Sequence, residues 1–138
     1  MKELLRDIKK LDYGSTGLAI SLVDIKEANE ILVSKKRPKL PKDVILFLQS
    51  YNGFRTEQGI IWGIDVKNHS SYDIVAENLI LPNPKPKDLL ILGQDDSKYI
   101  AYSQAHQRYV LLDNTNYEEL FSSKSYPNLI RQILKISA

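Results

Sequence analysis

The chain has 138 residues, of which 43% are hydrophobic and 26% are charged, and its formal net charge is +2. These proportions are typical of one globular domain with a continuous core, and they exclude a disordered chain. The absence of cysteine excludes disulfides, thiolate nucleophiles and cysteine-bound zinc. No apolar run is long enough to cross a membrane, and the charged N-terminus lacks the apolar stretch of a secretory signal, so we expect a cytoplasmic protein.

The positive charge is concentrated near the N-terminus. Residues 1–42 carry ten Lys and Arg against six Asp and Glu, whereas residues 43–138 carry nine against eleven. The densest basic run is 35–39. Such a run suits a nucleic acid or an acidic partner. However, aromatic residues that would stack on bases are not interleaved with it. We interpret it as the solvated end of a helix, where cations are favoured.

The first third of the chain is dominated by helical patterns. Residues 2–11 place their apolar side chains on one face of a short helix. A break with two glycines follows, and the alternation over 18–22 predicts a short strand. Asp24 with Glu27 three residues later forms a capping-box pattern, which predicts a helix that runs to about Lys36.

The stretch 40–54 predicts a further helix with one buried face, because its apolar residues recur at helical spacing. Pro41 suits the first helical position, where its missing N–H has no partner to lose. Asp43 then lies in the first turn, which the helix dipole favours. Gly53, beside the turn-prone Asn52, is suited to close the helix in the left-handed conformation.

Strand patterns appear after residue 54. Residues 59–64 are rich in β-branched and aromatic side chains and are flanked by glycine, so they predict a strand. Ser70 or Ser71 is expected to cap a helix over 72–79. The proline-rich segment 81–87 is stiff and extended, and we interpret it as a spacer in preference to a proline-recognition ligand.

The clearest β region is 89–113, with strands predicted over 89–93, 98–103 and 108–112. Asp95, Asp96 and Ser97 form a turn cluster between the first two. Asn116 with Glu119 forms another capping-box pattern, which predicts a helix through Phe121, and Pro127 begins a C-terminal helix. The resulting prediction is a single α+β domain over residues 1–138, a mainly antiparallel sheet with helices packed on one face.

No catalytic motif stands out. His69 and His106 both fall in predicted loops, outside any nucleophile frame. Asp95 and Asp96, with Asp113, suggest an oxygen-ligand metal site, but the ligand spacing of a calcium loop is missing and turns favour aspartate in any case. We therefore interpret the histidines as surface residues of loops and the aspartates as turn residues, and we expect no metal site.

Aromatic residues are the remaining candidates, either as interface or as core. Tyr99 and Tyr102 lie on opposite faces of one predicted strand, so at least one of them should face away from the helices. Tyr and Trp are enriched in binding hot spots and are equally ordinary in a core. We selected the interface candidates by side-chain type and by predicted loop or open-face position: Arg55, Trp62, Tyr72, Asp95, Asp96, Tyr99 and His106.

The order of motifs resembles the SUKH superfamily, which includes the Smi/Knr-like proteins. The resemblance rests on these stretches, in order: Leu40-Pro41, Phe47-Leu48, Asn52-Gly53, the strand 59–64, the strand–turn–strand 90–102, a third strand ending at Asp113, and a closing C-terminal helix. It covers residues 24–136. The turn at 95–97 departs from the glycines usual in the family, and residues 1–23 lie outside the matched region.

The resemblance implies a non-enzymatic immunity protein without a cofactor, which binds and neutralises a polymorphic or contact-dependent toxin inside the producing cell. We expect it to contact neither nucleic acid nor membrane. Many such toxins are nucleases, whose inhibitors are often acidic. The net charge of +2 counts against a nuclease partner in particular. One alternative is a regulatory scaffold of the Smi/Knr type, which acts in cell-envelope synthesis or signalling. Another is a small hydrolase or metal-dependent enzyme, which would rest on Asp95, Asp96 and His106.

Overall fold

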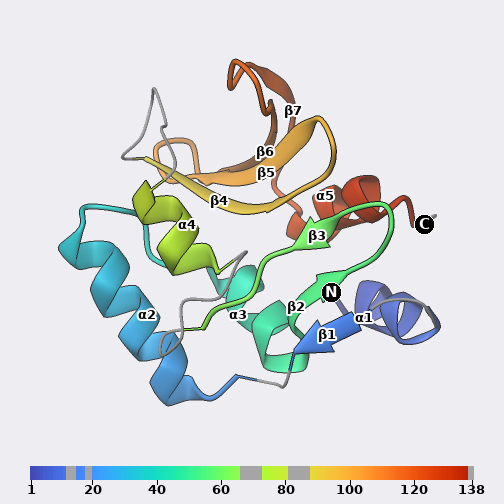
Figure 1. The fold of residues 1–138 in the computed structure, drawn as a ribbon, viewed down its shortest axis with the longest axis horizontal. Coiled ribbons are helices and arrows are strands. Elements are labelled where there is room, and N and C mark those ends of the chain that lie inside the picture. The colour runs from blue at the N-terminus through green and yellow to red at the C-terminus, as the bar shows by residue number, and fades with distance from the viewer. Residues whose placement is uncertain (12–14, 18–19, 66–72, 81–87, 137–138) are drawn as a thin grey trace.

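A computed structural model of the chain describes residues 1–11, 15–17, 20–65, 73–80 and 88–136 (Figure 1). The helices in these ranges are α1 (Lys2–Lys9), α2 (Leu22–Ser34), α3 (Lys42–Ser50), α4 (Ile74–Ile80) and α5 (Tyr126–Leu134). The strands are β1 (Ser15–Gly17), β2 (Asn52–Arg55), β3 (Ile60–Ile61), β4 (Leu89–Gln94), β5 (Lys98–Ser103), β6 (Arg108–Asp113) and β7 (Glu119–Ser123). Among the described helices, none has both the length and the apolar character needed to cross a bilayer.

The seven strands form one antiparallel sheet in which every strand pairs with its neighbour in sequence, in the order β1 to β7. Figure 1 shows this sheet running from β1, beside α1, to β7 at the top of the view. The predicted α+β class with a mainly antiparallel sheet is confirmed. Short connections join β2 to β3 and each strand from β4 to β7 to the next, and such hairpins need no crossover. The helices α2 and α3 lie between β1 and β2, and α4 lies between β3 and β4.

One sheet face is covered by α5 and by the start of α3. Tyr102 of β5 lies opposite Tyr109 of β6, so both rings are on the same face. Tyr109 stacks on Tyr126 of α5 with ring centroids 5.1 Å apart, and Tyr126 meets Phe47 of α3 edge-on at 6.1 Å. The core therefore joins the sheet to both helices through a row of aromatic rings.

Two asparagine side chains bind backbone at points where strand pairing stops. Asn78 of α4 is buried, and its amide accepts the Ile91 N–H at 2.7 Å and donates to the Ile91 carbonyl at 2.8 Å. The Asn52 amide binds Ile64 in the same way: it accepts the Ile64 N–H at 2.7 Å and donates to the Ile64 carbonyl at 2.9 Å. Each amide satisfies one donor and one acceptor that would otherwise be buried unpaired. Asn78 thereby fixes α4 against β4.

The role predicted for Asn52 and Gly53 as a helix stop is wrong. The helix α3 ends at Ser50, and Asn52 and Gly53 begin β2. Gly53 does adopt a positive φ of 86°, but a Cβ on it would lie 3.1 Å from the Gly63 nitrogen. Glycine is needed here because two backbone segments approach closely.

The helix predicted over 116–121 is also wrong, because 116–118 form a turn and 119–121 belong to β7. The Asn116 side chain accepts the Glu118 N–H at 2.9 Å, and Tyr117 has a left-handed φ of 60°. Both features make a turn, which returns the chain to pair with β6. Pairing with β6 here outweighs the local capping pattern of Asn116 and Glu119.

The beginning of α2 differs from its prediction as well. The helix starts at Leu22, inside the segment predicted as a strand, and Ser21 is its cap. The Ser21 hydroxyl accepts the Asp24 N–H at 3.2 Å and donates to the Asp24 carboxylate at 2.9 Å. The predicted spacer 81–87 and the predicted caps Ser70 and Ser71 lie outside the described residues.

Candidate interaction surfaces

The structure brings together four of the interface candidates and separates the others. Asp95, Asp96 and Tyr99 lie at the turn between β4 and β5, and Trp62 packs behind Tyr99. Arg55 is exposed at the end of β2, and His106 is exposed in the turn at the other end of β5. Tyr72 lies outside the described residues. Two surfaces follow from this arrangement. The four grouped residues lie at the first surface, and the turn that holds His106 borders the second.

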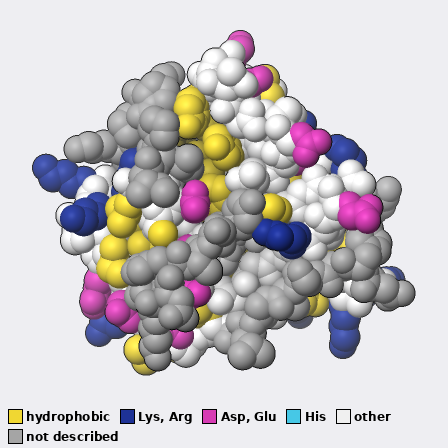
Figure 2. All heavy atoms as spheres, viewed as in Figure 1, with side chains coloured by type: hydrophobic (Ala, Val, Ile, Leu, Met, Phe, Trp, Pro, Cys, Tyr) yellow, Lys and Arg dark blue, Asp and Glu magenta, His cyan; other side chains and the backbone are white. Residues whose placement is uncertain are grey.

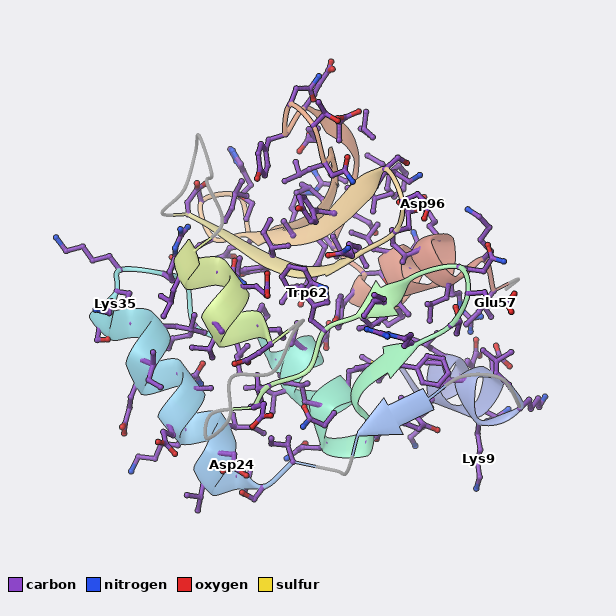
Figure 3. The ribbon with its side chains drawn as sticks, viewed as in Figure 1. Lys9, Asp24, Lys35, Glu57, Trp62 and Asp96 are labelled. Carbon is purple, nitrogen blue, oxygen red and sulfur yellow. The ribbon has the colours of Figure 1, made fainter. Side chains whose placement is uncertain are left out.

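We call the turns 95–98 and 113–118 the acidic turn end, because they carry four carboxylates and one lysine. Asn114 joins the two turns: its N–H donates to the Ser97 carbonyl at 2.9 Å, and its side-chain amide donates to the Asp96 carbonyl at 3.0 Å. Figure 3 places Asp96 at the periphery of the molecule. The acidic turn end is therefore one connected structure.

Two of its carboxylates build the turns. Asp95 accepts the N–H groups of Ser97 at 2.9 Å and Lys98 at 2.8 Å, and its other oxygen lies 3.4 Å from the Lys98 ammonium. Burial acts to raise the pKa of Asp95, but these hydrogen bonds and the Lys98 charge outweigh it, so the pKa lies below its ordinary value. Asp113 similarly accepts the N–H of Thr115 at 2.8 Å. This confirms the prediction that these aspartates belong to turns.

The other two carboxylates, on Asp96 and Glu118, have exposed side chains. They are therefore available to a partner without any change in the turns. Glu118 was absent from the sequence-based candidates because its segment was predicted to be helical. The signal that would have found it is the pair Asn114 and Asn116, since asparagine is typical of turns.

An aromatic cluster adjoins the acidic turn end. Tyr99 is half-buried, meets Trp62 edge-on at 6.3 Å and stacks on Tyr117 at 5.9 Å. Burial raises the pKa of Tyr99, with smaller contributions from Tyr117 and from the Glu77 carboxylate of α4. Tyr99 and Tyr117 both retain part of their surface in solvent. Figure 2 shows hydrophobic side chains gathered between α4 and β7, with acidic side chains above them.

The selection of Trp62 as a contact residue needs correction. Its side chain is 1% exposed and lies in the interior of the molecule (Figure 3). Trp62 directly follows β3, its backbone N–H donates to the Leu92 carbonyl at 2.9 Å, and its ring packs against Tyr99. Trp62 therefore supports the Tyr99 ring and does not face a partner.

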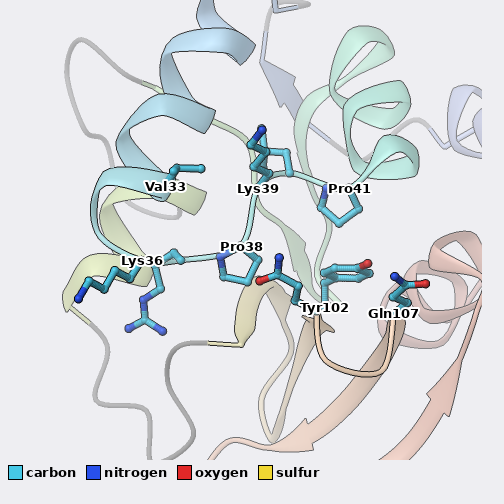
Figure 4. A pocket seen from close by; sticks show the side chains of 10 residues that line it. Val33, Lys36, Pro38, Lys39, Pro41, Tyr102 and Gln107 are labelled. Atoms are coloured by element: carbon cyan, nitrogen blue, oxygen red, sulfur yellow. The ribbon is translucent and has the colours of Figure 1, made fainter.

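The second surface is a cleft of about 520 Å³ between the link from α2 to α3 and the turn from β5 to β6 (Figure 4). We call it the basic cleft. It is lined by Val33, Lys36, Arg37, Pro38, Lys39, Leu40, Pro41, Tyr102, Gln104 and Gln107. Three of these ten residues are cations and none is a carboxylate. The fold thus places most of the basic run 35–39 over the uncharged turn 104–107.

The wall formed by the α2–α3 link is held by backbone bonds. The Arg37 N–H donates to the Leu32 carbonyl at 2.8 Å, and the Lys36 N–H donates to the Val33 carbonyl at 3.0 Å. This pair of bonds is a Schellman motif, which ends α2. The Leu40 N–H donates to the Asn29 side chain at 2.8 Å. These backbone bonds and the Asn29 side chain hold the link in place.

The opposite wall is anchored through Tyr102. Its ring lies 5.1 Å from that of Tyr109, which belongs to the aromatic row that reaches α5. Gln104 and Gln107 are exposed on the turn beside it, and Gln107 has a left-handed φ of 51°. Both walls of the cleft are thus connected to the core.

Within the described ranges, no group of three or more His, Asp or Glu side chains gathers as a metal ion would require. The acidic turn end and the basic cleft are the surfaces with the most distinctive chemistry. A scan of the chain against models of known protein families gives no match, and comparisons with curated proteins and with solved structures give none either.

Proposed function

We propose that this protein is a non-enzymatic, immunity-type inhibitor that binds a cognate polymorphic or contact-dependent toxin through its acidic turn end. The observation that carries the proposal is the joining of two acidic turns by Asn114, which presents Asp96 and Glu118 beside half-exposed Tyr99. The resemblance of the motif order to SUKH proteins supports the same function.

The local charge removes the objection raised by the net charge. The chain as a whole carries +2, but the acidic turn end has four carboxylates against one lysine. A surface of this sign is complementary to a basic cleft, such as one that binds the phosphates of a nucleic acid substrate. A nuclease or another toxin with a basic active site is therefore the partner we favour.

The aromatic cluster supplies binding affinity, which charge alone does not. Electrostatic complementarity mainly speeds association and selects the partner, whereas buried aromatic side chains contribute most of the affinity. Tyr99 is held by Trp62 on one side and Tyr117 on the other, so little conformational entropy is lost when a partner covers it.

The test is rescue of a bacterial host that expresses the toxin domain encoded beside the gene for this protein. Co-expression of the unaltered chain should restore growth. The double variant Asp96→Lys with Glu118→Lys should lose protection, because two charge reversals at an interface weaken binding by roughly 100-fold or more.

The matched control is Glu27→Lys with Glu57→Lys, which reverses two exposed carboxylates elsewhere and should protect fully. Protection by both double variants would contradict the acidic turn end as the binding surface. No rescue by the unaltered chain, together with binding to envelope-synthesis or signalling proteins, would favour the regulatory scaffold instead.

A further inference from the structure

The basic cleft contains a lysine in an unfavourable backbone conformation. Lys36 occupies the position after the α2 cap with φ 60°, which glycine adopts without strain and other residues adopt at a cost. Within the described residues, the Lys36 ammonium makes no hydrogen bond or ion pair. The fold itself therefore gains nothing from a lysine here, and a ligand in the cleft would explain its charge.

The chemistry of the lining specifies the kind of ligand. Lys36 and Lys39 are suited to carboxylates, and Gln104 and Gln107 on the facing wall have amides that both donate and accept, as a peptide backbone requires. Pro38 and Tyr102 between them offer an apolar floor. The lysines, the glutamine amides and the apolar floor together match the carboxylates, the backbone amides and the apolar side chains of an acidic peptide.

The same lining argues against a nucleic acid. Single-stranded nucleic acid is bound by several aromatic side chains on which successive bases stack. Tyr102 is the one aromatic residue among the ten that line the cleft, and its ring already packs against Tyr109 at 5.1 Å. The cleft therefore has cations without a stacking platform.

The walls are also arranged in advance of binding. The Leu40 N–H is bonded to Asn29, and Pro38 and Pro41 have no N–H and a fixed φ. Tyr102 is held by the aromatic row. A cleft that does not have to be ordered on binding loses less affinity to entropy, and a volume of about 520 Å³ holds a few residues of an extended chain.

We propose that the basic cleft binds an extended acidic segment of a protein partner, with carboxylates placed on Lys36 and Lys39 and its backbone amides placed on Gln104 and Gln107. The cleft lies at the opposite end of β5 from the acidic turn end, so this site is separate from the proposed toxin surface. The proposal does not depend on the immunity function.

The test uses the full chain and a fluorescein-labelled ten-residue peptide that alternates glutamate with alanine, in a fluorescence anisotropy titration. The glutamate peptide should bind at least tenfold more tightly than the same peptide with glutamine. In the Lys36→Gly variant, peptide affinity should fall by about fivefold, the value of one lost charge contact. The melting temperature of this variant should rise by roughly 3 °C, because the strained residue is replaced.

Lys135→Gly is the matched control. Lys135 also has a left-handed φ, 57°, at the end of α5, and it lies outside the basic cleft. This variant also loses one positive charge. Its melting temperature should rise by a similar amount, while its peptide affinity stays unchanged. A structural role alone would make the two variants behave alike.

Three results would overturn the proposal. The first is equal binding of the glutamate and glutamine peptides, and the second is unchanged peptide affinity in Lys36→Gly. The third is displacement of the labelled peptide by inorganic phosphate or by a ten-nucleotide RNA at lower concentrations than by unlabelled peptide. None of these measurements involves a toxin, so their outcome is independent of the rescue experiment.

Discussion

The two ends of β5 carry opposite charges and obtain them in opposite ways. At the acidic turn end, the carboxylates of Asp95 and Asp113 accept backbone N–H groups and so hold the turns in shape. At the basic cleft, backbone bonds and the Asn29 side chain hold the link, and Lys36 occupies a conformation that glycine would adopt more easily. The Asp95 and Asp113 carboxylates are part of the fold at one end, whereas the Lys36 charge is an addition to the fold at the other.

This difference separates stability from binding. Where a charged side chain builds a turn, its replacement must weaken the fold whatever it does to a partner. Where a charged side chain is supported by a backbone that does not need it, its replacement should leave the fold intact or strengthen it. Three substitutions, of Asn78, Asp95 and Gln107, test which side chains the two ends of β5 need for their stability, in order of decreasing effect.

Asn78→Ala should damage both ends together, because Asn78 fixes β4, which leads into the acidic turn end and pairs with β5. The change leaves the buried N–H and carbonyl of Ile91 without the partners now at 2.7 and 2.8 Å. We expect the free energy of unfolding to fall by roughly 3 kcal/mol, measured by urea denaturation.

Asn128→Ala is its control, since Asn128 is exposed on α5. It should change the free energy of unfolding by less than about 0.5 kcal/mol. A similar small change in Asn78→Ala would show that α4 is not held through this amide.

Asp95→Ala should lower the free energy of unfolding by about 2 kcal/mol, because two backbone N–H groups lose a charged acceptor. Its neighbour gives a direct comparison. Asp96 has an exposed carboxylate, so Asp96→Ala should leave the urea midpoint nearly unchanged. Equal effects of the two variants would remove the distinction between turn-building and partner-facing carboxylates.

The dependence of stability on pH provides a second measurement at Asp95. Its pKa in the folded chain is lowered from the ordinary value of 3.8, so the ionised carboxylate adds stability at neutral pH. That contribution should be lost as the pH falls below about 4 toward the folded pKa. Urea midpoints at pH 5 and pH 3 should therefore differ less in Asp95→Asn than in the unaltered chain.

Gln107→Gly should raise the free energy of unfolding by about 1 kcal/mol or less, because Gln107 has φ 51° in the turn beside the basic cleft. Gln104 begins the same turn without a positive φ, so Gln104→Gly should give a small loss instead. Both changes in the free energy of unfolding are measured by thermal unfolding. A loss in Gln107→Gly would mean that its side chain contributes to the turn.

The sequence predicts most helices and strands because their apolar periodicity agrees with the final packing, as in 2–11 and 98–103. It fails where a distant segment decides the outcome. The Asn116–Glu119 pattern favours a helix locally, but β6 offers a strand to pair with. Asn52 and Gly53 look like a helix stop because their real partners, Ile64 and Gly63, are ten or more residues away.

The candidate surfaces could be predicted only in part for the same reason. Asp95, Asp96 and Tyr99 are close in sequence and were found together. Tyr117 and Glu118 come from another turn, which only the sheet register places beside them. The run 35–39 was interpreted as a solvated helix end, because nothing in its own residues shows that Tyr102 and Gln107 face it.

The pairing of α1 with α5 has a consequence for folding kinetics. The strands from β4 to β7 are joined by short turns, so this part of the sheet has local contacts that form fast. The ion pair between Asp7 and Arg131, 2.8 Å long, instead joins residues 124 positions apart. Closing so long a loop is slow compared with forming a hairpin. The sheet from β4 to β7 is therefore expected to form early, through successive hairpins, and the docking of α5 onto α1 to complete the native state.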